Sequence, residues 1–116
     1  VLNRTLARAE ALAREIGAVV TAPEVLAGAA LVINALSVPP EIDIAALRAD
    51  AVLMDMTYRP LETAFLAAGR ARGLTCVDGL AMLIGQARPS FEALFGVPPP
   101  PIDIRTVALQ AMESDA

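Results

Sequence analysis

The sequence predicts an α/β fold, in which a mostly parallel sheet carries helices on both of its faces. Short apolar runs alternate along the chain with stretches of helical periodicity, a pattern typical of βαβ units. The composition agrees, because 56% of the residues are hydrophobic but only 3% are aromatic. Such a composition suits strands that are buried on both faces. The apolar runs read "AVV" at 18–20, "AALVINA" at 29–35, "ADAVLMDM" at 49–56 and "LTCV" at 74–77.

The first two long helices are predicted from apolar spacing and from the glycines that follow. Residues 4–16 place Leu6, Ala9, Ala13 and Ile16 at helical spacing ahead of Gly17. Residues 60–72 form the second helix, which Pro60 opens and Gly73 ends.

Two further helices follow the last apolar run. The first covers 80–88, where Pro89 breaks or restarts it, and it resumes up to Gly96. The second covers 102–114 and returns to pack on the domain. A chain of 116 residues has room for one domain, so we expect a single domain over 1–116, with 97–116 as a Pro-rich linker and returning helix.

Composition also excludes several kinds of partner. The net charge of −4 argues against nucleic acid, whose phosphates demand clustered positive charge. No apolar run is long and uncharged enough for a membrane span, and no signal-peptide pattern is present. The chain has no histidine and a single cysteine, Cys76, which predicts no metal site and a reduced, cytoplasmic location.

Ligands of parallel α/β sheets bind beyond the carboxyl ends of the strands. The polar residues that directly follow the apolar runs are therefore candidates for a binding site. They are Asn3-Arg4-Thr5, Asn34 to Ser37, Asp55 to Tyr58, and Asp78-Gly79.

Arg4 and Arg8 lie four residues apart, on one face, in the first turns of a predicted helix. A helix N-terminus already carries positive partial charge, so the pair is locally unfavourable unless an anion binds there. In a dinucleotide-binding fold, Asn followed by Arg at this place favours the 2′-phosphate of NADP over the free hydroxyl of NAD. The alternative is that both arginines are simply solvated on an exposed helix face.

Four ordered motifs resemble those of the shikimate dehydrogenase family, from residue 1 to about residue 96. The similarity extends to the Rossmann-like fold of these enzymes, although the first strand and the Gly-rich loop of that fold are absent here. The motifs are "NRTLARAEALA", "VINALS", "DMTYRPLETAFL" and "GLTCVDGLAMLIGQARPSFEALFG".

The resemblance implies an NADP-dependent oxidoreductase that interconverts 3-dehydroshikimate and shikimate in aromatic amino acid biosynthesis. By the same resemblance, Tyr58 and Gln86 reach a substrate of the shikimate or quinate class. The residues implied to bind the cofactor are Asn3, Arg4, Thr5 and Arg8 at the 2′-phosphate, and Met56, Gly79 and Met82 near the nicotinamide. Plainer roles remain open, with Tyr58 capping a turn, Gln86 solvated, and both methionines in the core.

The chain departs from the family pattern in two places. After Asn34 the family's T-S-x-G-M is replaced by Leu36-Ser37-Val38-Pro39-Pro40, which removes a hydroxyl expected near the cofactor. The family's catalytic Lys and Asp belong to an amino-terminal substrate domain, and this chain contains no lysine. We therefore assign no catalytic residue and expect the chain to be inactive alone, as the carboxyl portion of a longer enzyme. Unpaired strand edges would then make a homo-oligomer possible.

Two other functions remain open at this point. One is a non-catalytic nucleotide-binding or interaction module derived from the same fold, which the missing loop and lysine would suit. The other is a dehydrogenase that acts on a different acid, although Tyr58 and Gln86 make it less favoured.

Overall fold

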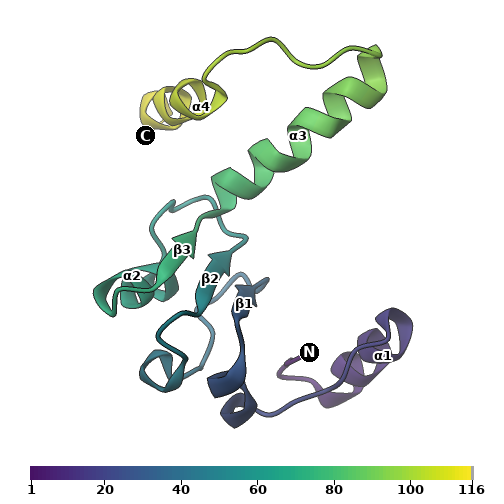
Figure 1. The fold of residues 1–116 in the computed structure, drawn as a ribbon, viewed down its shortest axis with the longest axis vertical. Coiled ribbons are helices and arrows are strands. Elements are labelled where there is room, and N and C mark those ends of the chain that lie inside the picture. The colour runs from purple at the N-terminus through teal and green to yellow at the C-terminus, as the bar shows by residue number, and fades with distance from the viewer. Residues whose placement is uncertain (116) are drawn as a thin grey trace.

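The computed structural model describes residues 1–115 and contains a parallel sheet of three strands in the order β1-β2-β3 (Figure 1). Leu31 of β1 pairs with Val52 of β2, which pairs with Thr75 of β3. The predicted α/β class and parallel sheet are confirmed. The strands, shorter than the apolar runs, are β1 (Leu31–Asn34), β2 (Val52–Asp55) and β3 (Thr75–Val77).

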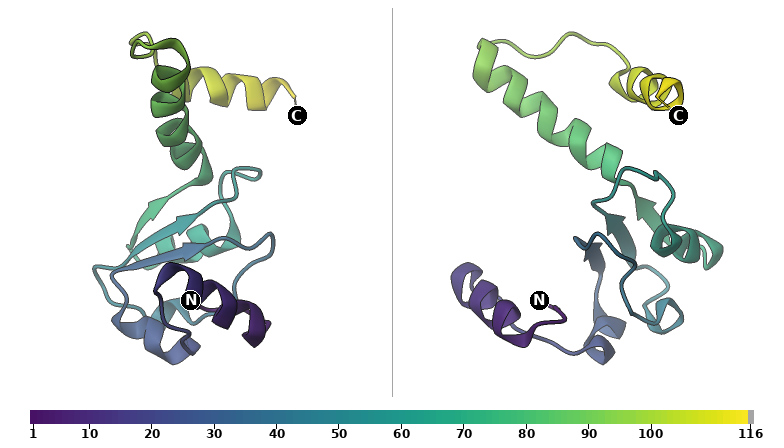
Figure 2. Two further views of the ribbon diagram at one scale, coloured as in Figure 1. Left: turned by 90° about the vertical axis from the view of Figure 1, so that its right-hand side faces the viewer. Right: turned by 180° about the vertical axis from the view of Figure 1, so that it is seen from behind.

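The core forms where helix α2 (Ala64–Ala71) packs against one face of the sheet (Figure 2). Leu53 from the central strand and Leu66 from α2 are both 0% exposed. The backbone of α2 approaches β2 closely, because a Cβ added to Gly69 would lie 2.5 Å from Cδ1 of Leu53. The face of the edge strand β1 that points away from the core is open, since Leu31 and Ile33 are each 52% exposed.

The remaining helices extend away from this core (Figures 1 and 2). Helix α1 lies beyond the β1 edge of the sheet, and α3 leaves the sheet at the end of β3. The extended segment 97–103 then joins α3 to α4, which turns back towards the rest of the chain. The bounds are α1 (Leu6–Ile16), η1 (Pro23–Gly28), η2 (Ile44–Ala46), α3 (Gly79–Phe95) and α4 (Ile104–Ser114).

The prediction that a helix opens at Pro60 is wrong. Residues 60–63 are not helical, and α2 begins only after Thr63, whose backbone is extended at φ −85° and ψ 160°. The Thr63 side chain accepts a hydrogen bond from the Leu66 N–H at 3.3 Å. This N-terminal cap fixes where the helix starts, and Pro60 lies in the loop before it.

The prediction of a break at Pro89 is also wrong, because α3 runs without interruption from Gly79 to Phe95. Pro89 has no N–H, so the Gly85 carbonyl loses its helical partner. Both residues are exposed, so water can hydrogen-bond to that carbonyl. One residue further on, the Ser90 hydroxyl donates to the Gln86 carbonyl at 2.8 Å.

Two expectations for the amino-terminal region are corrected as well. In α1 only Ala9 and Ala13 are buried, whereas Leu6 and Ile16 are 61% and 60% exposed. The run at 18–20 is not assigned as a strand, although it pairs with the first residue as parallel strands do. The Val1 amino group donates to the Val19 carbonyl at 2.6 Å, and the Thr21 N–H donates to the Val1 carbonyl at 3.0 Å.

Within residues 1–115, no helix combines the length and the apolar character that crossing a membrane would require.

The close approach of α2 to β2 predicts that Gly69→Ala destabilises the fold. The new methyl group would overlap Leu53 and sit 3.0 Å from Sγ of Cys76, so we expect a loss of about 1–3 kcal/mol in the free energy of unfolding. Urea denaturation followed by circular dichroism measures the change.

Gly85→Ala in α3 is the matched control. Nothing lies within 4 Å of a Cβ added there, and alanine favours a helix over glycine by up to about 1 kcal/mol. Equal effects of the two substitutions would contradict the packing of α2 on β2.

Candidate functional site

Each strand of the sheet ends at, or is followed by, a buried polar residue, and all three residues lie at the carboxyl edge. Asn34 ends β1 and Asp55 ends β2, and the two are paired in the sheet register. Asp78 follows β3 and is the N-cap of α3. The exposed fractions are 5% for Asn34, 1% for Asp55 and 7% for Asp78.

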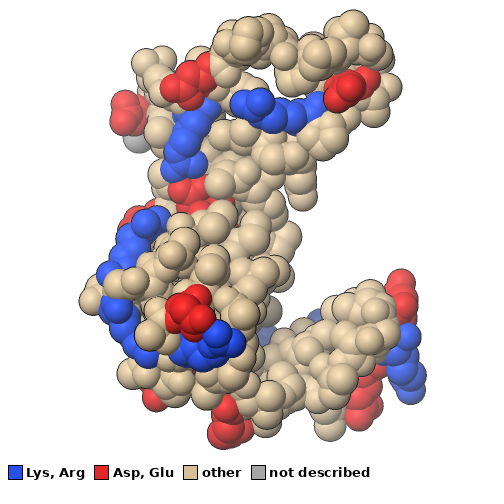
Figure 3. Space-filling model, viewed as in Figure 1, with Lys and Arg blue, Asp and Glu red and all other residues tan. Residues whose placement is uncertain are grey.

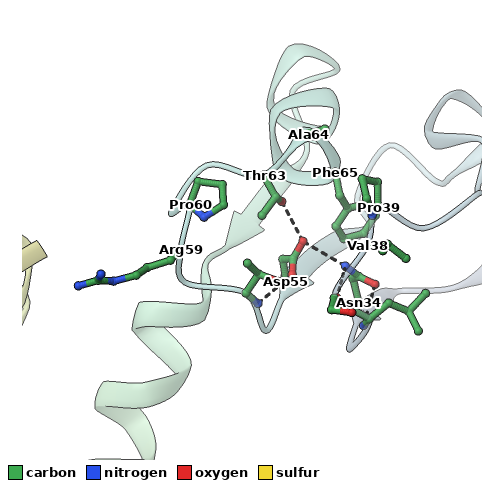
Figure 4. A pocket seen from close by; sticks show the side chains of 12 residues that line it. Asn34, Val38, Pro39, Asp55, Arg59, Pro60, Thr63, Ala64 and Phe65 are labelled. Carbon is green, nitrogen blue, oxygen red and sulfur yellow. Dashed lines mark hydrogen bonds between the residues drawn. The ribbon is translucent and has the colours of Figure 1, made fainter. Parts of the chain in front are cut away.

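The Asp55 carboxylate is fully occupied by hydrogen bonds (Figure 4). Its Oδ1 accepts from the Thr57 N–H at 2.9 Å. Its Oδ2 accepts from the Thr63 hydroxyl at 2.8 Å and from Nδ2 of Asn34 at 3.2 Å. Burial alone would raise the pKa of this carboxyl, but the donors favour its charged form, and the pKa lies below the usual value.

Asp78 joins α3 to α4. Its Oδ1 caps α3 by accepting from the Ala81 N–H at 2.9 Å. The guanidinium of Arg105, in α4, donates to Oδ2 at 2.6 Å and to Oδ1 at 3.2 Å. This paired hydrogen bond is the main reason that the pKa of Asp78 lies below the usual value. The carboxylate of Asp78 therefore sets the start of α3 through its cap and the position of α4 through its ion pair with Arg105.

Gly79 brings the first turn of α3 against the loop that follows β2. A Cβ at this position would lie 2.4 Å from the Thr57 carbonyl oxygen and 2.6 Å from that of Met56. Only glycine permits this approach, since the neighbouring atoms are backbone. The loop with Met56 and Tyr58 therefore lies directly against the N-terminus of α3.

The two segments that meet at this corner carry five of the predicted site residues. Met56 and Tyr58, in the loop, are 40% and 43% exposed. Gly79, Met82 and Gln86 fall at positions i, i+3 and i+7 of α3 and so share one face of that helix. Gly79 is buried, Met82 is partly buried, and Gln86 is exposed.

The other four predicted residues form a separate group at the start of α1. Asn3, Arg4, Thr5 and Arg8 are all exposed. Thr5 is the N-cap of α1, but its side chain makes no capping hydrogen bond. Oδ1 of Asn3 instead accepts from the Thr5 N–H at 2.8 Å. This group lies beyond the β1 edge of the sheet, whereas the α3 corner follows β3 at the opposite edge (Figure 1). Within residues 1–115 no further strand lies between β1 and α1.

A pocket of about 190 Å³ opens beside the Asp55 network, between the segment after β1 and the start of α2. Leu36, Val38 and Pro39 form one wall, so the residues that depart from the family pattern lie here. Figure 4 shows Arg59 directed away from this pocket, towards the carboxyl-terminal end of the chain, where it pairs with Asp115 at 3.3 Å.

Sequence reasoning did not single out the side chains that hold the site together. Asn34, Asp55 and Asp78 were noted as polar residues after strands and within the motifs, Thr63 stood only within the motif "DMTYRPLETAFL", and Arg105 was not noted at all. Thr63 could have been found from the N-cap preference for threonine before an apolar helical run. Arg105 gave no such signal, because its partner lies 27 positions earlier in the chain.

The fold matches that of solved enzymes. The chain superposes on shikimate 5-dehydrogenase from Thermus thermophilus in complex with shikimate, with a TM-score of 0.85, 33% identity, and coverage of 97% of this chain and 44% of that one. For the same enzyme in complex with NADP(H) and shikimate, the TM-score is 0.78 at 34% identity, covering 87% and 41%. No family model matches the chain.

Curated protein sequences show the same similarity to shikimate dehydrogenases. The NADP(+) shikimate dehydrogenase of Methylobacterium radiotolerans is 49% identical over 111 residues, covering 85% of this chain and 39% of the relative. Over most of its length the chain is therefore similar to shikimate dehydrogenases. The Caulobacter vibrioides shikimate dehydrogenase is 43% identical, covering 97% of this chain and 44% of its own length. The chain thus spans about two fifths of the shikimate dehydrogenases that it matches.

The Asp78–Arg105 pair predicts a pH-dependent contribution to the stability of the fold. The pKa of Asp78 is lowered on folding, so the pair stabilises the fold above about pH 4 and loses its effect as the pH falls through the folded pKa. Arg105→Gln should lower the free energy of unfolding near neutral pH by about 1–2 kcal/mol, less than for a fully buried pair because the Arg105 side chain is 41% exposed.

Denaturant titrations between neutral and acidic pH test this expectation. Arg59→Gln is the control, because its pair with Asp115 is exposed on both sides and should contribute less than about 1 kcal/mol. A destabilisation by Arg105→Gln that stays constant below pH 4 would rule out the ionised pair as its cause.

Proposed function

We propose that this chain is the cofactor-binding part of an NADP-dependent shikimate dehydrogenase, which interconverts 3-dehydroshikimate and shikimate in aromatic amino acid biosynthesis. The observation that carries the proposal is the 40–49% identity to NADP(+) shikimate dehydrogenases over most of the chain. Residues 1–116 are then a partial dinucleotide-binding domain, with 97–116 as linker and returning helix.

The start of α1 fits the 2′-phosphate of NADP. The side chains of Arg4 and Arg8 make no hydrogen bond or ion pair within residues 1–115, and no side chain caps the helix. Two free guanidinium groups and the open N–H groups of a helix N-terminus are suitable donors for a phosphate. In this proposal Asn3 and Thr5 complete the phosphate site.

Several other arginines of the chain are already engaged in contacts with other groups. Figure 3 shows basic side chains gathered on the side of the molecule where α2 lies. There Arg70 pairs with Glu62 at 3.1 Å, and Arg72 donates to the carbonyl oxygens of Ile44, at 2.6 Å, and of Leu47. These contacts leave the arginines of α1 as the better candidates for an anionic ligand.

The α3 corner would hold the other end of the cofactor and the substrate. Met56, Gly79 and Met82 supply an apolar wall for the nicotinamide, where the lack of a side chain on Gly79 lets the loop that carries Met56 lie against the start of α3. Tyr58 and Gln86 supply a hydroxyl and an amide for the carboxylate and hydroxyl groups of shikimate. When bound, NADP accepts or returns the hydride of the reaction.

Several narrower statements belong to the same proposal. The chain contains no lysine, so we infer that it does not catalyse the reaction by itself. Its partners would be a small substrate and possible further copies of the chain, with neither nucleic acid nor membrane involved. With one cysteine, it suits the cytoplasm.

Quinate is the second candidate substrate. The chain is 30% identical to quinate dehydrogenase from Corynebacterium glutamicum in complex with NAD, with a TM-score of 0.72 and coverage of 85% of this chain and 42% of that one. The Arg4 and Arg8 pair favours a cofactor with a 2′-phosphate, which is NADP rather than NAD. It therefore favours the NADP-dependent shikimate dehydrogenase over the quinate dehydrogenase. A non-catalytic nucleotide-binding module stays as the alternative, favoured by Leu36 and Pro39 in the pocket wall.

Arg4→Ala should weaken binding of adenosine 2′,5′-bisphosphate by about 10- to 100-fold, the effect of losing one charged hydrogen bond. Binding of AMP, which lacks the 2′-phosphate, should change little. Isothermal titration calorimetry with both nucleotides measures the difference.

Arg14→Ala is the matched control, since Arg14 is an exposed arginine in the last turn of the same helix. It should leave both affinities unchanged. Equal losses for the two nucleotides in Arg4→Ala would argue against recognition of a 2′-phosphate.

A further inference from the structure

The segment that carries Tyr58 is a loop whose two ends meet at one side chain. This loop, residues 56–62, begins after Asp55 and ends before Thr63. At its start the Thr57 N–H donates to the Asp55 carboxylate, and at its end the Thr63 hydroxyl donates to the same carboxylate. A single buried group therefore closes the 56–62 loop.

The same carboxylate also attaches the loop to the rest of the fold. Nδ2 of Asn34 ties it to β1, and Thr63 ties it to α2 by capping that helix. The Met56 N–H extends the sheet pairing by donating to the Asn34 carbonyl at 3.0 Å. The entry and the exit of the loop are thus fixed to three rigid elements, β1, β2 and α2.

Between these fixed ends, Tyr58 has little support of its own. Its side chain is 43% exposed, and the structure gives its hydroxyl no hydrogen bond within residues 1–115. The neighbouring Arg59 reaches only the exposed Asp115. The direction of Tyr58 therefore depends on the backbone of the loop rather than on contacts of the ring.

We propose that Asp55 is the positioning residue of the candidate site: by closing the 56–62 loop it fixes the backbone that carries Tyr58 beside the start of α3, where a polyhydroxylated carboxylic acid would bind. The inference rests on the proposed function for the role of Tyr58 towards substrate. Asp55 itself does not touch the ligand, because only 1% of it is exposed.

Tyr58 gives this proposal a direct readout, because it is the chain's only tyrosine and the chain has no tryptophan. Its fluorescence in the full chain therefore reports the loop alone. In Asp55→Asn an NH2 group replaces one carboxylate oxygen, so one of the donors loses its acceptor. The loop should then move more, and the fast part of the Tyr58 anisotropy decay should grow about two-fold. Added shikimate should change the Tyr58 emission of the parent chain at a concentration about ten-fold lower than in Asp55→Asn.

Thr63 provides a second pair of variants. They test whether the closure of the 56–62 loop restrains Tyr58 if Asp55→Asn does not fold. Thr63→Val removes the hydroxyl and should free Tyr58, whereas Thr63→Ser keeps the hydroxyl and should restore the parent signal. The control Thr106→Val removes a hydroxyl that donates to Asp103 at 2.7 Å at the start of α4, and Asp43→Asn alters a similar turn in η2. Neither control should change the Tyr58 anisotropy.

The outcomes separate the inference from the proposed function. If Asp55→Asn or Thr63→Val lowers the thermal midpoint but leaves the Tyr58 anisotropy at the parent value, Asp55 is a stabilising residue only and the inference is overturned. If the anisotropy responds as expected but shikimate has no effect on the parent chain, the closure of the loop by Asp55 stands and the substrate role of Tyr58 fails.

Discussion

The carboxylate of Asp55 is buried at the carboxyl edge of the sheet, and a charge in that position is tolerated only when hydrogen-bond donors surround it. Those donors come from the end of β1, from the turn after β2 and from the cap of α2. Satisfying one charge therefore fixes three segments relative to one another. The spacing of β1 and β2, the start of α2 and the path of the 56–62 loop all depend on it.

Asp78 repeats this arrangement one strand further along. Like Asp55 it is buried at the carboxyl edge of the sheet, but Asp78 itself caps the next helix, and both of its oxygens accept from Arg105 of α4. Together the two aspartates set the geometry around Gly79, where α3 comes within contact of the loop backbone. The corner that would hold nicotinamide and substrate is thus built by charged groups that lie behind it, while the residues facing outwards are apolar or neutral.

Local patterns were sufficient for the fold class and for most of the elements. Alternating apolar and helical stretches predicted a parallel α/β sheet, and four ordered motifs carried the resemblance to shikimate dehydrogenases. The patterns failed where the outcome depended on side-chain contacts. Pro60 looked like the first residue of a helix, but the cap is made by Thr63; Pro89 looked like a break, but it lies on an exposed face where the lost hydrogen bond costs little. The exposed Leu6 and Ile16 show the same limit, because periodicity does not reveal which element covers a helix face.

By itself, the sequence determined the fold class, the family, the arginine pair at the start of α1, and the placement of Tyr58 and Gly79 just after strands. These features follow from short-range spacing, which is written in consecutive residues. The tertiary structure decided how the corner is held: that Asp55 closes a loop, that Arg105 reaches Asp78 across 27 positions, and that Gly79 must lack a side chain because two backbone carbonyls lie against it. Such contacts depend on burial and on segments distant in the chain, so no local pattern specifies them.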